Sequence, residues 1–597
     1  MGPMNLAKTM VSTCARCADR TYLAGTVDAN YREWRFREFR SRVEQWAAAL
    51  ATHGVGEGDR VAFITPKSPN QTFAFYAVWW LGAIAVPISE TLADLEMAFI
   101  LRDSEPTVVL VDETMAGKVR RVTGGATECV FRFASLSQPT ASQRREPVVG
   151  EADATAALIY TSGSTGMPKG VMLSHRNLLV NARSSLDSMD LNAADTFVSL
   201  LPYWHSFALT VEVVLSMEVG YRVTIPKDRR DFAKNVANYK PTVILLVPRI
   251  AAALLTGIRK KLSSSSPGLR RLFDLALYNA SRIFHTTPGM RGGILRMLAH
   301  KALYDPIVFR KVRRRFGGCL RFFVSGGAPL DLEPQLFFKY VGVPIHQGYG
   351  LTESSPTISV NSDASHRLGS CGSMLSWLTP EGGGDWTFLD EEGDTGKDRR
   401  GELLVRGDCV MQGYWRHRDD SAKTCRDGWL HTGDMGYVED GFLFLDGRQG
   451  NMIVLLGGEK VHPEHIEDAI KGSPLVSEAM VFGDKCKNLY VCVNVDPEEY
   501  AALPEGEAMA RLWDEVRVRT QHLAPFQRPK DVLVLPDFTI EEGTLTATLK
   551  IRRHKVWEVS ADPIRAFLKK NNEELVARDD DGDASAFAGI GKTLASE

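Results

Sequence analysis

Residues 161–170, with the sequence TSGSTGMPKG, have the residue types of a phosphate-binding loop. Glycines let backbone N–H groups approach an oxyanion closely, hydroxyls donate further hydrogen bonds, and Lys169 adds a positive charge. The apolar runs 156–160 and 171–173 predict a strand on each side of the loop. The segment lacks the Gly-Lys pair of P-loop NTPases and contains no G-x-G-x-x-G. We therefore expect a triphosphate loop of another architecture; a flexible Ser/Gly linker is the alternative.

Two further glycine-rich loops follow strand-like apolar runs. One has the sequence SGGAPLD at 325–331, and the other has GYGLTE at 348–353. Ligands in open α/β sheets bind beyond the carboxyl ends of strands, so the three loops are expected to converge on one crevice. Glu353 suits Mg²⁺, which proteins hold with one or two carboxylates plus substrate phosphates. The simpler alternative for GYGLTE is a turn before a helix, with Glu353 at the positive end of the helix dipole.

The elements that must position these loops follow two patterns. Residues 1 to about 150 alternate helical and strand patterns, including an amphipathic helix at 36–53 and a strand at 60–65. Between 401 and 446 the apolar residues alternate with period two. Asp-Gly pairs at 427–428 and 440–441 interrupt this run, which predicts antiparallel hairpins.

Composition limits the class of protein. The chain has 597 residues, 44% of them apolar and 24% charged, which suits a globular protein of more than one structural unit. The net charge of −2 does not favour binding of nucleic acid.

Nine cysteines without a signal segment indicate free thiols in a reducing, cytoplasmic compartment. The longest uncharged stretch, 68–89, has an apolar part shorter than the ~20 residues of a membrane span, so we expect a buried helix and a strand there.

Residues 256–316 form a strongly basic region. It holds fourteen Arg and Lys against two Asp, a local net charge of +12, interleaved with apolar segments. Such a region is a candidate for peripheral contact with an anionic membrane surface. A solvated helical insertion is the alternative.

Motifs along the chain resemble those of the adenylate-forming superfamily, which comprises AMP-forming acyl-CoA synthetases, luciferases and peptide-synthetase adenylation domains. They are the loop at 161–170, SGGAPL at 325–330, GYGLTE at 348–353, WLHTGD at 429–434, DGRQGN at 446–451 and TLTATLKIRR at 544–553. The resemblance covers roughly residues 25–558. The ending TLKIRR, together with VPRI at 247–250 and SPGLRRLF at 266–273, looks most like long-chain acyl-CoA synthetases.

The resemblance implies roles for individual residues. Tyr349 would stack on adenine, Thr352 would contact phosphate, and Glu353 with Thr165 would hold Mg²⁺. Asp434 would accept hydrogen bonds from both ribose hydroxyls, which suits an acceptor-only carboxylate. The implied nucleotide-binding residues are Thr161, Ser162, Gly163, Ser164, Thr165, Gly166, Lys169, Gly326, Gly327, Ala328, Gln347, Gly348, Tyr349, Gly350, Asp434 and Arg448. The implied catalytic residues are Lys550, Thr352, Glu353 and His205.

Three of these assignments have plain alternatives. Without the resemblance, Asp434 is more simply a turn residue, Lys550 a solvated surface charge, and His205 a structural histidine. The implied hinge also departs from the family pattern, because Gly450 stands where Asp or Lys is usual and Asn451 replaces a common acidic residue. Glycine permits rotation, but side-chain contacts that favour one domain orientation would be missing.

The resemblance implies an α/β fold of two domains. We expect a large N-terminal domain at 1–446, with mixed, mostly parallel sheets flanked by helices and a β-rich subdomain. A hinge at 447–451 would lead to a small, mobile α+β C-terminal domain at 452–560, followed by a helix and an acidic, disordered tail at 561–597. The implied residues of the hinge and coenzyme A channel are Gly450, Gly457, Gly458 and Glu459.

The implied function is a two-step ligase reaction. ATP and Mg²⁺ would activate a fatty, long-chain carboxylic acid to acyl-AMP with release of pyrophosphate, and the acyl group would pass to coenzyme A. The expected partners are these small molecules. Two alternatives stay open: an acyl-AMP ligase that loads a carrier-protein phosphopantetheine, and a non-catalytic protein that binds nucleotide or acyl groups.

Overall fold

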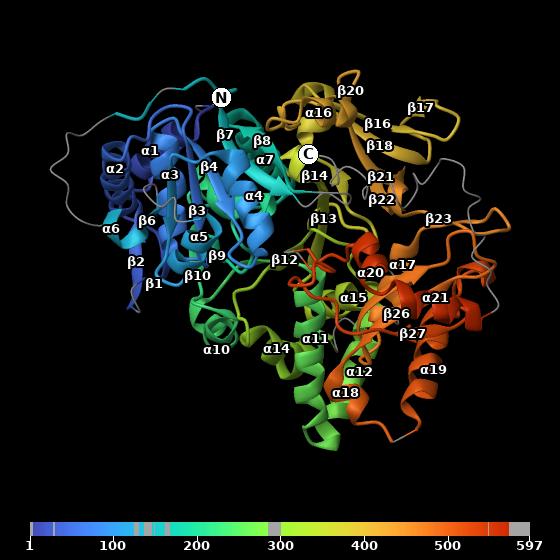
Figure 1. Cartoon of the computed structure of the whole chain (residues 1–597). Coiled ribbons are helices and arrows are strands. Elements are labelled where there is room, and N and C mark those ends of the chain that lie inside the picture. The colour runs from blue at the N-terminus through green and yellow to red at the C-terminus, as the bar shows by residue number, and fades with distance from the viewer. Residues whose placement is uncertain are drawn as a thin grey trace, which may run out of the picture.

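The computed structural model describes residues 4–27, 30–124, 130–136, 146–148, 150–161, 167–284, 300–504, 506–546 and 549–571. Figure 1 shows a large N-terminal part built on β-sheets and, below its β-rich strands, a smaller C-terminal part in orange and red. Among the described residues, no helix is long and apolar enough to cross a membrane.

A seven-stranded sheet carries the first predicted loop. Its strands, in spatial order, are β19 (Gly413–Tyr414), β8 (Lys169–Ser174), β7 (Thr155–Thr161), β4 (Ile84–Ile88), β3 (Arg60–Ile64), β5 (Val108–Val111) and β6 (Val130–Arg132). The strands β7, β4, β3, β5 and β6 are parallel, whereas β8 returns antiparallel to β7. The loop therefore joins two adjacent strands, which confirms the predicted strand on each side of it.

A nine-stranded sheet carries the other two loops. Its strands, in spatial order, are β15 (Ser373–Met374), β14 (Thr357–Val360), β13 (Ile345–Gly350), β12 (Phe322–Ser325), β11 (Val243–Leu246), β9 (Thr196–Val198), β10 (Arg222–Ile225), β1 (Thr21–Val27) and β2 (Asn30–Arg35). The run from β13 to β1 is parallel. The loops after β12 and β13 consequently leave adjacent strands at the same edge, as predicted.

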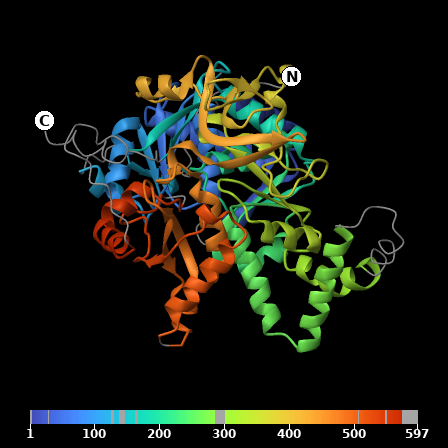
Figure 2. The same cartoon turned by 90° about the vertical axis from the view of Figure 1, so that its right-hand side faces the viewer.

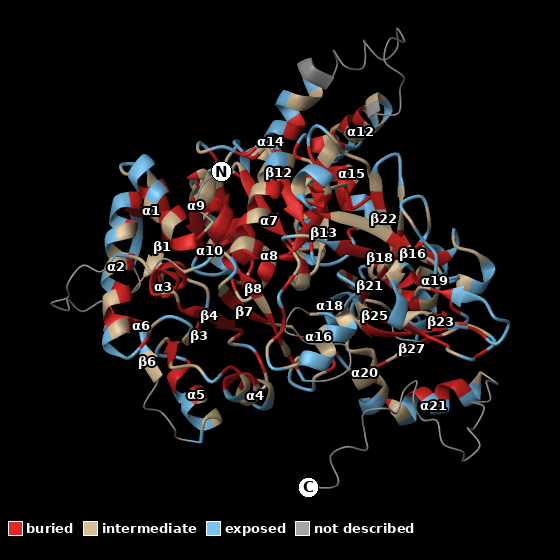
Figure 3. Ribbon diagram, turned by 90° about the horizontal axis from the view of Figure 1, so that it is seen from above, coloured by how far each residue is buried: buried red, intermediate tan, exposed pale blue. Residues whose placement is uncertain are grey.

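Helices bury the faces of these two sheets. Figure 3 shows the sheets and the inner faces of their helices as buried. The main covering helices are α1 (Leu6–Arg16), α2 (Phe36–Thr52), α3 (Pro69–Trp80), α4 (Asp94–Ser104), α5 (Ala116–Val122), α7 (His175–Ser188), α10 (Arg229–Tyr239) and α15 (Leu332–Val341). The uncharged stretch 68–89 forms α3 and β4, which confirms the predicted buried helix and strand.

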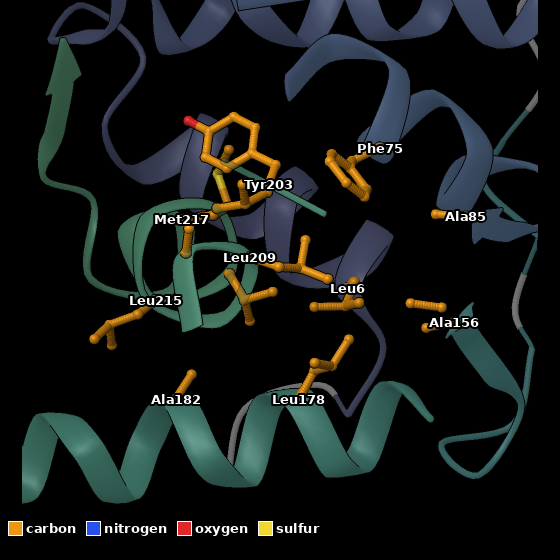
Figure 4. Close-up of a cluster of buried hydrophobic side chains, with 14 of the residues drawn as sticks. Leu6, Phe75, Ala85, Ala156, Leu178, Ala182, Tyr203, Leu209, Leu215 and Met217 are labelled. Atoms are coloured by element: carbon orange, nitrogen blue, oxygen red, sulfur yellow. The ribbon is translucent and has the colours of Figure 1, made fainter. Parts of the chain in front are cut away.

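One apolar cluster ties the two sheets together (Figure 4). Leu178 and Ala182, one turn apart on α7, face Leu209 on the π-helix η1 (Leu209–Leu215) and Leu6 on α1. The start of α7 is held by Ser174, whose Oγ accepts a hydrogen bond from the N–H of Asn177 at 3.1 Å. This capping satisfies a backbone donor that the helix itself leaves free.

A third sheet of antiparallel strands follows, as the period-two pattern predicted. Its strands are β16 (Asp385–Leu389), β17 (Thr395–Gly396), β18 (Gly401–Arg406), β20 (Cys425–Arg426), β21 (Trp429–Glu439) and β22 (Phe442–Arg448). Both predicted Asp-Gly pairs form two-residue turns. Asp427 and Gly428 have φ of 53° and 79°, and Asp440 and Gly441 have φ of 50° and 81°. Positive φ at both central positions matches the twist of a hairpin.

The C-terminal part has hydrophobic clusters of its own. Its elements are β23 (Ile453–Val454), β24 (Lys460–Val461), α17 (Pro463–Lys471), β25 (Val476–Phe482), β26 (Tyr490–Val495), α18 (Pro497–Ala501), α19 (Ala508–Thr520), β27 (Val532–Val534), α20 (Arg553–Val559) and α21 (Ala561–Lys570). The acidic segment predicted to be a tail lies mostly beyond residue 571, outside the described residues.

The basic region is helical where it is described. It comprises α11 (Pro248–Ser263), α12 (Pro267–Phe284), the π-helix η2 (His300–Phe309) and α14 (Arg310–Arg314). In Figure 2 the green helices of this region project away from the sheets. Residues 285–299 lie outside the described residues.

Candidate functional site

The loops after β12 and β13 meet in one crevice. Gly326 and Gly327 line it from one side, and residues 348–352 line it from the other. His205, Ser206 and Phe207 also line it. The predicted convergence therefore holds for these two loops. Of the loop at 161–170, the structure describes only the ends, because Ser162, Gly163, Ser164, Thr165 and Gly166 lie outside the described residues.

Close packing explains the glycines of the loop at 348–353. A Cβ at Gly350 would lie 1.8 Å from the carbonyl oxygen of Pro356, and one at Gly348 would lie 3.1 Å from the carbonyl oxygen of Ser359. No larger residue fits at Gly350 without moving the neighbouring backbone. The loop thus lies flat against β14 and leaves the crevice open.

Asp434 is held at the crevice by two donors. The hydroxyl of Tyr349 donates to its Oδ2 at 2.7 Å, and Nε of Arg448 donates to its Oδ1 at 3.0 Å. The side chains come from β13, β21 and β22, which the adjacent sheets bring together. Each carboxylate oxygen has a further lone pair, so both can still accept from a diol. The predicted grouping of Tyr349, Asp434 and Arg448 is confirmed as geometry.

A second charged group surrounds Glu353. The hydroxyl of Tyr414 donates to Glu353 Oε1 at 2.8 Å, and burial raises the pKa of Tyr414, so that it remains a donor. Nζ of Lys169 lies 2.8 Å from Oδ2 of Asp420 and 5.5 Å from the ring centre of Tyr414. The hydrogen bond from Lys169 is the main reason that the pKa of Asp420 is lowered.

Tyr414 and Asp420 were not predicted from the sequence. They lie on β19 and on α16 (Arg418–Thr424), more than 240 residues beyond Lys169. No motif marks them, because only the pairing of β19 with β8 brings this segment to the first loop.

Thr352 and His205 both line the crevice. Thr352 Oγ1 and Ser206 Oγ are 3.2 Å apart, and Nδ1 of His205 accepts a hydrogen bond from the N–H of Phe207 at 3.4 Å. Burial, with a smaller contribution from the charge of Lys550, lowers the pKa of His205 to about 4. His205 is therefore neutral at pH 7.

Lys550 reaches the same crevice from the C-terminal part. It sits on a tight turn in which Leu549 has φ of 60° and the N–H of Thr546 donates to the carbonyl of Lys550 at 2.8 Å. Its side chain keeps contact with solvent, yet surrounding protein lowers its pKa: desolvation acts first and Arg448 second. Asp434 and Glu353 oppose this shift. Lys550 thus lies among the residues that the sequence analysis grouped with it.

Several predicted residues lie elsewhere. The side chain of Gln347 is buried behind the loop, where its Oε1 accepts from Gln335 at 3.2 Å. The predicted channel residues Gly457, Gly458 and Glu459 form the turn between β23 and β24, which is closed by a hydrogen bond from Leu455 N–H to Glu459 O at 2.9 Å. The channel role of these residues therefore stays a prediction.

The hinge segment is attached to the C-terminal part, because Nδ2 of Asn451 donates to Oε1 of Glu464 on α17 at 2.7 Å. This contact lies within that part, so the expected lack of side-chain contacts that favour one domain orientation stays a prediction. Gly450 does match the expected freedom, since a Cβ there would meet no atom within 4 Å.

The oxygen atoms around Glu353 show whether this residue fits a Mg²⁺ ion. Glu353 has one oxygen bonded to Tyr414, and its Oε2 has no hydrogen-bond partner among the described residues. The described part of the chain holds no group of three or more His, Cys, Asp or Glu side chains fit to hold a metal. One free carboxylate oxygen fits an ion that takes most ligands from phosphates and water, as Mg²⁺ does.

These observations define a nucleotide-binding enzyme whose crevice combines loops of two sheets with a lysine from a C-terminal layer. The chain belongs to the AMP-binding enzyme family: residues 11–415 match that family, and residues 450–572 match an AMP-binding enzyme C-terminal domain.

Named relatives support this membership. The long-chain-fatty-acid–CoA ligase FadD15 of Mycobacterium bovis is 29% identical over 571 residues, covering 89% of this chain and 92% of its own. The long-chain-fatty-acid–[acyl-carrier-protein] ligase AEE15 of Arabidopsis thaliana is 28% identical over 605 residues, covering 87% and 81%. The solved O-succinylbenzoate coenzyme A synthetase of Bacillus subtilis, in complex with ATP and magnesium ion, has a TM-score of 0.68 at 23% identity, with 91% and 98% covered.

The lowered pKa of His205 predicts a pH effect. Its folded-state pKa of about 4 lies below the ordinary 6.5, so the unfolded chain binds the proton more tightly between these values. Stability contributed by the neutral imidazole is therefore present above pH 6.5 and lost as pH falls toward 4. His205→Gln should make the unfolding free energy fall less steeply across this window, as measured by denaturant titration at several pH values. His465→Gln, at an exposed position, serves as the control; equal slopes for wild type and His205→Gln would contradict the assignment.

Proposed function

We propose that this chain activates a long-chain fatty acid with ATP and Mg²⁺ to acyl-AMP, releases pyrophosphate, and transfers the acyl group to coenzyme A. The observation that carries the proposal is the position of Lys550. It lies close enough to Asp434, Glu353 and Arg448 for their charges to act on its pKa, and its own charge acts on His205 of the crevice, although more than 100 residues separate it from each of them along the chain. A lysine that the C-terminal part places beside a site for anions suits a reaction on phosphate.

The charges have a chemical purpose in the first step. A carboxylate that attacks the α-phosphorus of ATP approaches a polyanion, and charge builds up further as the oxygens crowd the phosphorus. Lys169 and Lys550 would offset this charge, and the hydroxyl of Thr352 would orient a phosphate oxygen. Bound Mg²⁺ would supply further positive charge on the phosphates, held by Glu353 with Thr165. Asp434 would orient the ribose by accepting from its hydroxyls.

The crevice also offers apolar surface for the acid. Phe207, Val211, Val324, Val360 and Met189 line it beside the loops. Apolar walls next to a phosphate site suit an acyl chain whose carboxylate must reach the α-phosphorus. The names of relatives such as FadD15 support a long-chain fatty acid as the substrate.

We further propose that residues 1–446 and 452–560 act as two domains joined at 447–451. The separate hydrophobic clusters of the C-terminal part and the open surroundings of Gly450 support this division. Rotation at the hinge would carry Lys550 out of the crevice between the two steps.

A carrier-protein ligase is the second candidate, favoured by the relative AEE15. A test that separates the candidates is ATP-dependent pyrophosphate release with fatty acids of graded chain length. Free coenzyme A or a phosphopantetheinylated carrier protein is then added as acceptor. We expect long-chain acids to release pyrophosphate and coenzyme A to accept the acyl group. Thioester on the carrier protein alone would favour the second candidate, and no pyrophosphate with any acid would favour a non-catalytic protein.

Lys550→Ala should separate the two half-reactions. Loss of a charge that stabilises a transition state costs on the order of 10²–10³ in rate, so adenylate formation should fall by about that factor. Thioester formation from pre-made acyl-AMP and coenzyme A needs no charge on pyrophosphate and should remain close to wild type. Pyrophosphate exchange and thioester formation are the measurements, with Lys569→Ala on the exposed face of α21 as the control. Equal loss of both steps in a folded variant would refute this role.

We also propose a cytoplasmic protein that contacts an anionic membrane surface peripherally through the basic region. Arg271, Leu275, Tyr278 and Arg282 follow the spacing of one helical stripe on α12, and all four are exposed. Leu275 and Tyr278 are 48% and 63% exposed, which is unusual for large apolar side chains without a partner surface. Basic residues beside exposed apolar ones match the composition of an interfacial helix.

Charge reversal on α12 tests the membrane contact. Each basic residue near an anionic surface contributes about 1 kcal/mol, so Arg270→Glu with Arg271→Glu should weaken binding to anionic vesicles at least about tenfold. Vesicle sedimentation at low and high salt measures this effect. The matched double variant Lys569→Glu with Lys570→Glu on α21 should bind as wild type does. Binding that is equal for neutral and anionic vesicles would remove the proposal.

A further inference from the structure

An ion pair fastens the turn that carries Lys550 to the large part of the chain. Two residues after Lys550, Nη2 of Arg552 donates to Oε1 of Glu96 at 2.5 Å. The N–H of Arg552 also donates to the carbonyl of Thr544 at 2.9 Å, which closes the base of the turn. Arg552 therefore links the turn to a residue 456 positions away in sequence.

Glu96 stands on a rigid support. It lies in the first turn of α4, whose Met97, Ile100 and Leu101 are buried against the seven-stranded sheet. A carboxylate in the first turn of a helix is also favoured by the helix dipole. The position of Glu96 is consequently set by the large part of the chain.

Burial distinguishes this pair from other ion pairs that join the two parts. The side chains of Arg552 and Glu96 are each 15% exposed, whereas those of Lys460 and Glu391 are 46% and 61% exposed. Arg249 and Glu478 are 61% and 13% exposed and lie 3.7 Å apart. Exposed pairs contribute about 0–1 kcal/mol, while hydrogen bonds between charged groups shielded from water contribute more. The Glu96–Arg552 pair is therefore the stronger fastening.

We propose that Glu96 is a positioning residue for the first half-reaction, which holds the Lys550 turn in the crevice through Arg552. This inference rests on the proposed function, and it assigns a task to Glu96, which no motif marks, and to Arg552 of the TLKIRR ending. When the C-terminal part rotates, the pair must break, so its strength sets the balance between the conformation that forms acyl-AMP and the one that forms thioester.

The pair is built to open. Nε of Arg552 is buried and has no hydrogen-bond partner among the described residues. An unsatisfied buried donor costs free energy in the fastened conformation and so offsets part of the gain from the ion pair. The free-energy difference that favours the fastened conformation is thereby kept small, so the pair can open.

The test compares the two half-reactions in Glu96→Gln and Glu96→Arg. If each rate follows the population of its own conformation, the ratio of adenylate formation to thioester formation follows the ratio of the populations. Loss of a charged hydrogen bond should lower this ratio about tenfold or more, whatever the starting populations. Glu96→Arg, which places two cations together, should lower it further. The double variant Glu96→Arg with Arg552→Glu should restore the ratio.

A matched control is available in the chain. Glu391→Gln removes the exposed pair with Lys460 and should leave the ratio unchanged. The proposal is overturned if Glu96→Gln leaves the ratio at its wild-type value, if Glu391→Gln shifts it equally, or if the double variant fails to restore it. A merely structural role of Glu96 would lower both rates together and would leave the ratio unchanged.

A second measurement needs no catalysis. Glu96→Gln should increase hydrogen exchange at the backbone amides of residues 549–553, and Glu391→Gln should not. If wild type forms no acyl-AMP with any acid yet this exchange still increases, the proposed function fails and the fastening stands. If acyl-AMP forms and neither exchange nor ratio changes, the function stands and the fastening fails.

Discussion

Mutual repulsion among cations is the constraint around which the crevice is built. Lys169, Lys550 and Arg448 gather where a polyphosphate fits, and cations gathered in a partly desolvated cleft destabilise one another. Carboxylates offset this repulsion: Asp420 pairs with Lys169, Asp434 pairs with Arg448, and Asp434 with Glu353 counters the desolvation of Lys550. Each carboxylate is thus a counter-ion as well as a prospective ligand of nucleotide, ribose or metal.

The two sheets explain how these charges meet. Parallel strands end at a common edge, so loops after β12 and β13 project into the same space, and the antiparallel return of β8 brings Lys169 to it. Small residues keep that space open, since Gly350 packs directly on the backbone of Pro356. The antiparallel third sheet then adds Asp434 and Arg448 from neighbouring strands. A rigid scaffold supports residues that must hold their orientation.

Lys550 follows a different principle. It stands on a turn of the C-terminal part, and its place in the crevice depends on contacts between the two parts rather than on a sheet. Large buried contacts would fix it there, whereas single ion pairs allow the turn to leave. The two parts are joined by such ion pairs: the partly shielded pair of Glu96 and Arg552, and the more exposed pairs at Lys460 and Arg249. The structure therefore places Arg448 and Asp434 on sheet strands, and Lys550 on a turn that ion pairs attach to the large part.

The sequence alone determined the features that depend on neighbours along the chain. The strands around 161–170 and the Asp-Gly hairpins could be predicted because backbone conformation there follows local composition and periodicity. The motifs also identified Glu353, Asp434 and Lys550, since each lies in a short recognisable segment. Tertiary structure alone decided their partners. Tyr414, Asp420 and Glu96 carry no local mark, because an ion pair or hydrogen bond between residues hundreds of positions apart depends on how strands and helices are packed, which no local pattern records.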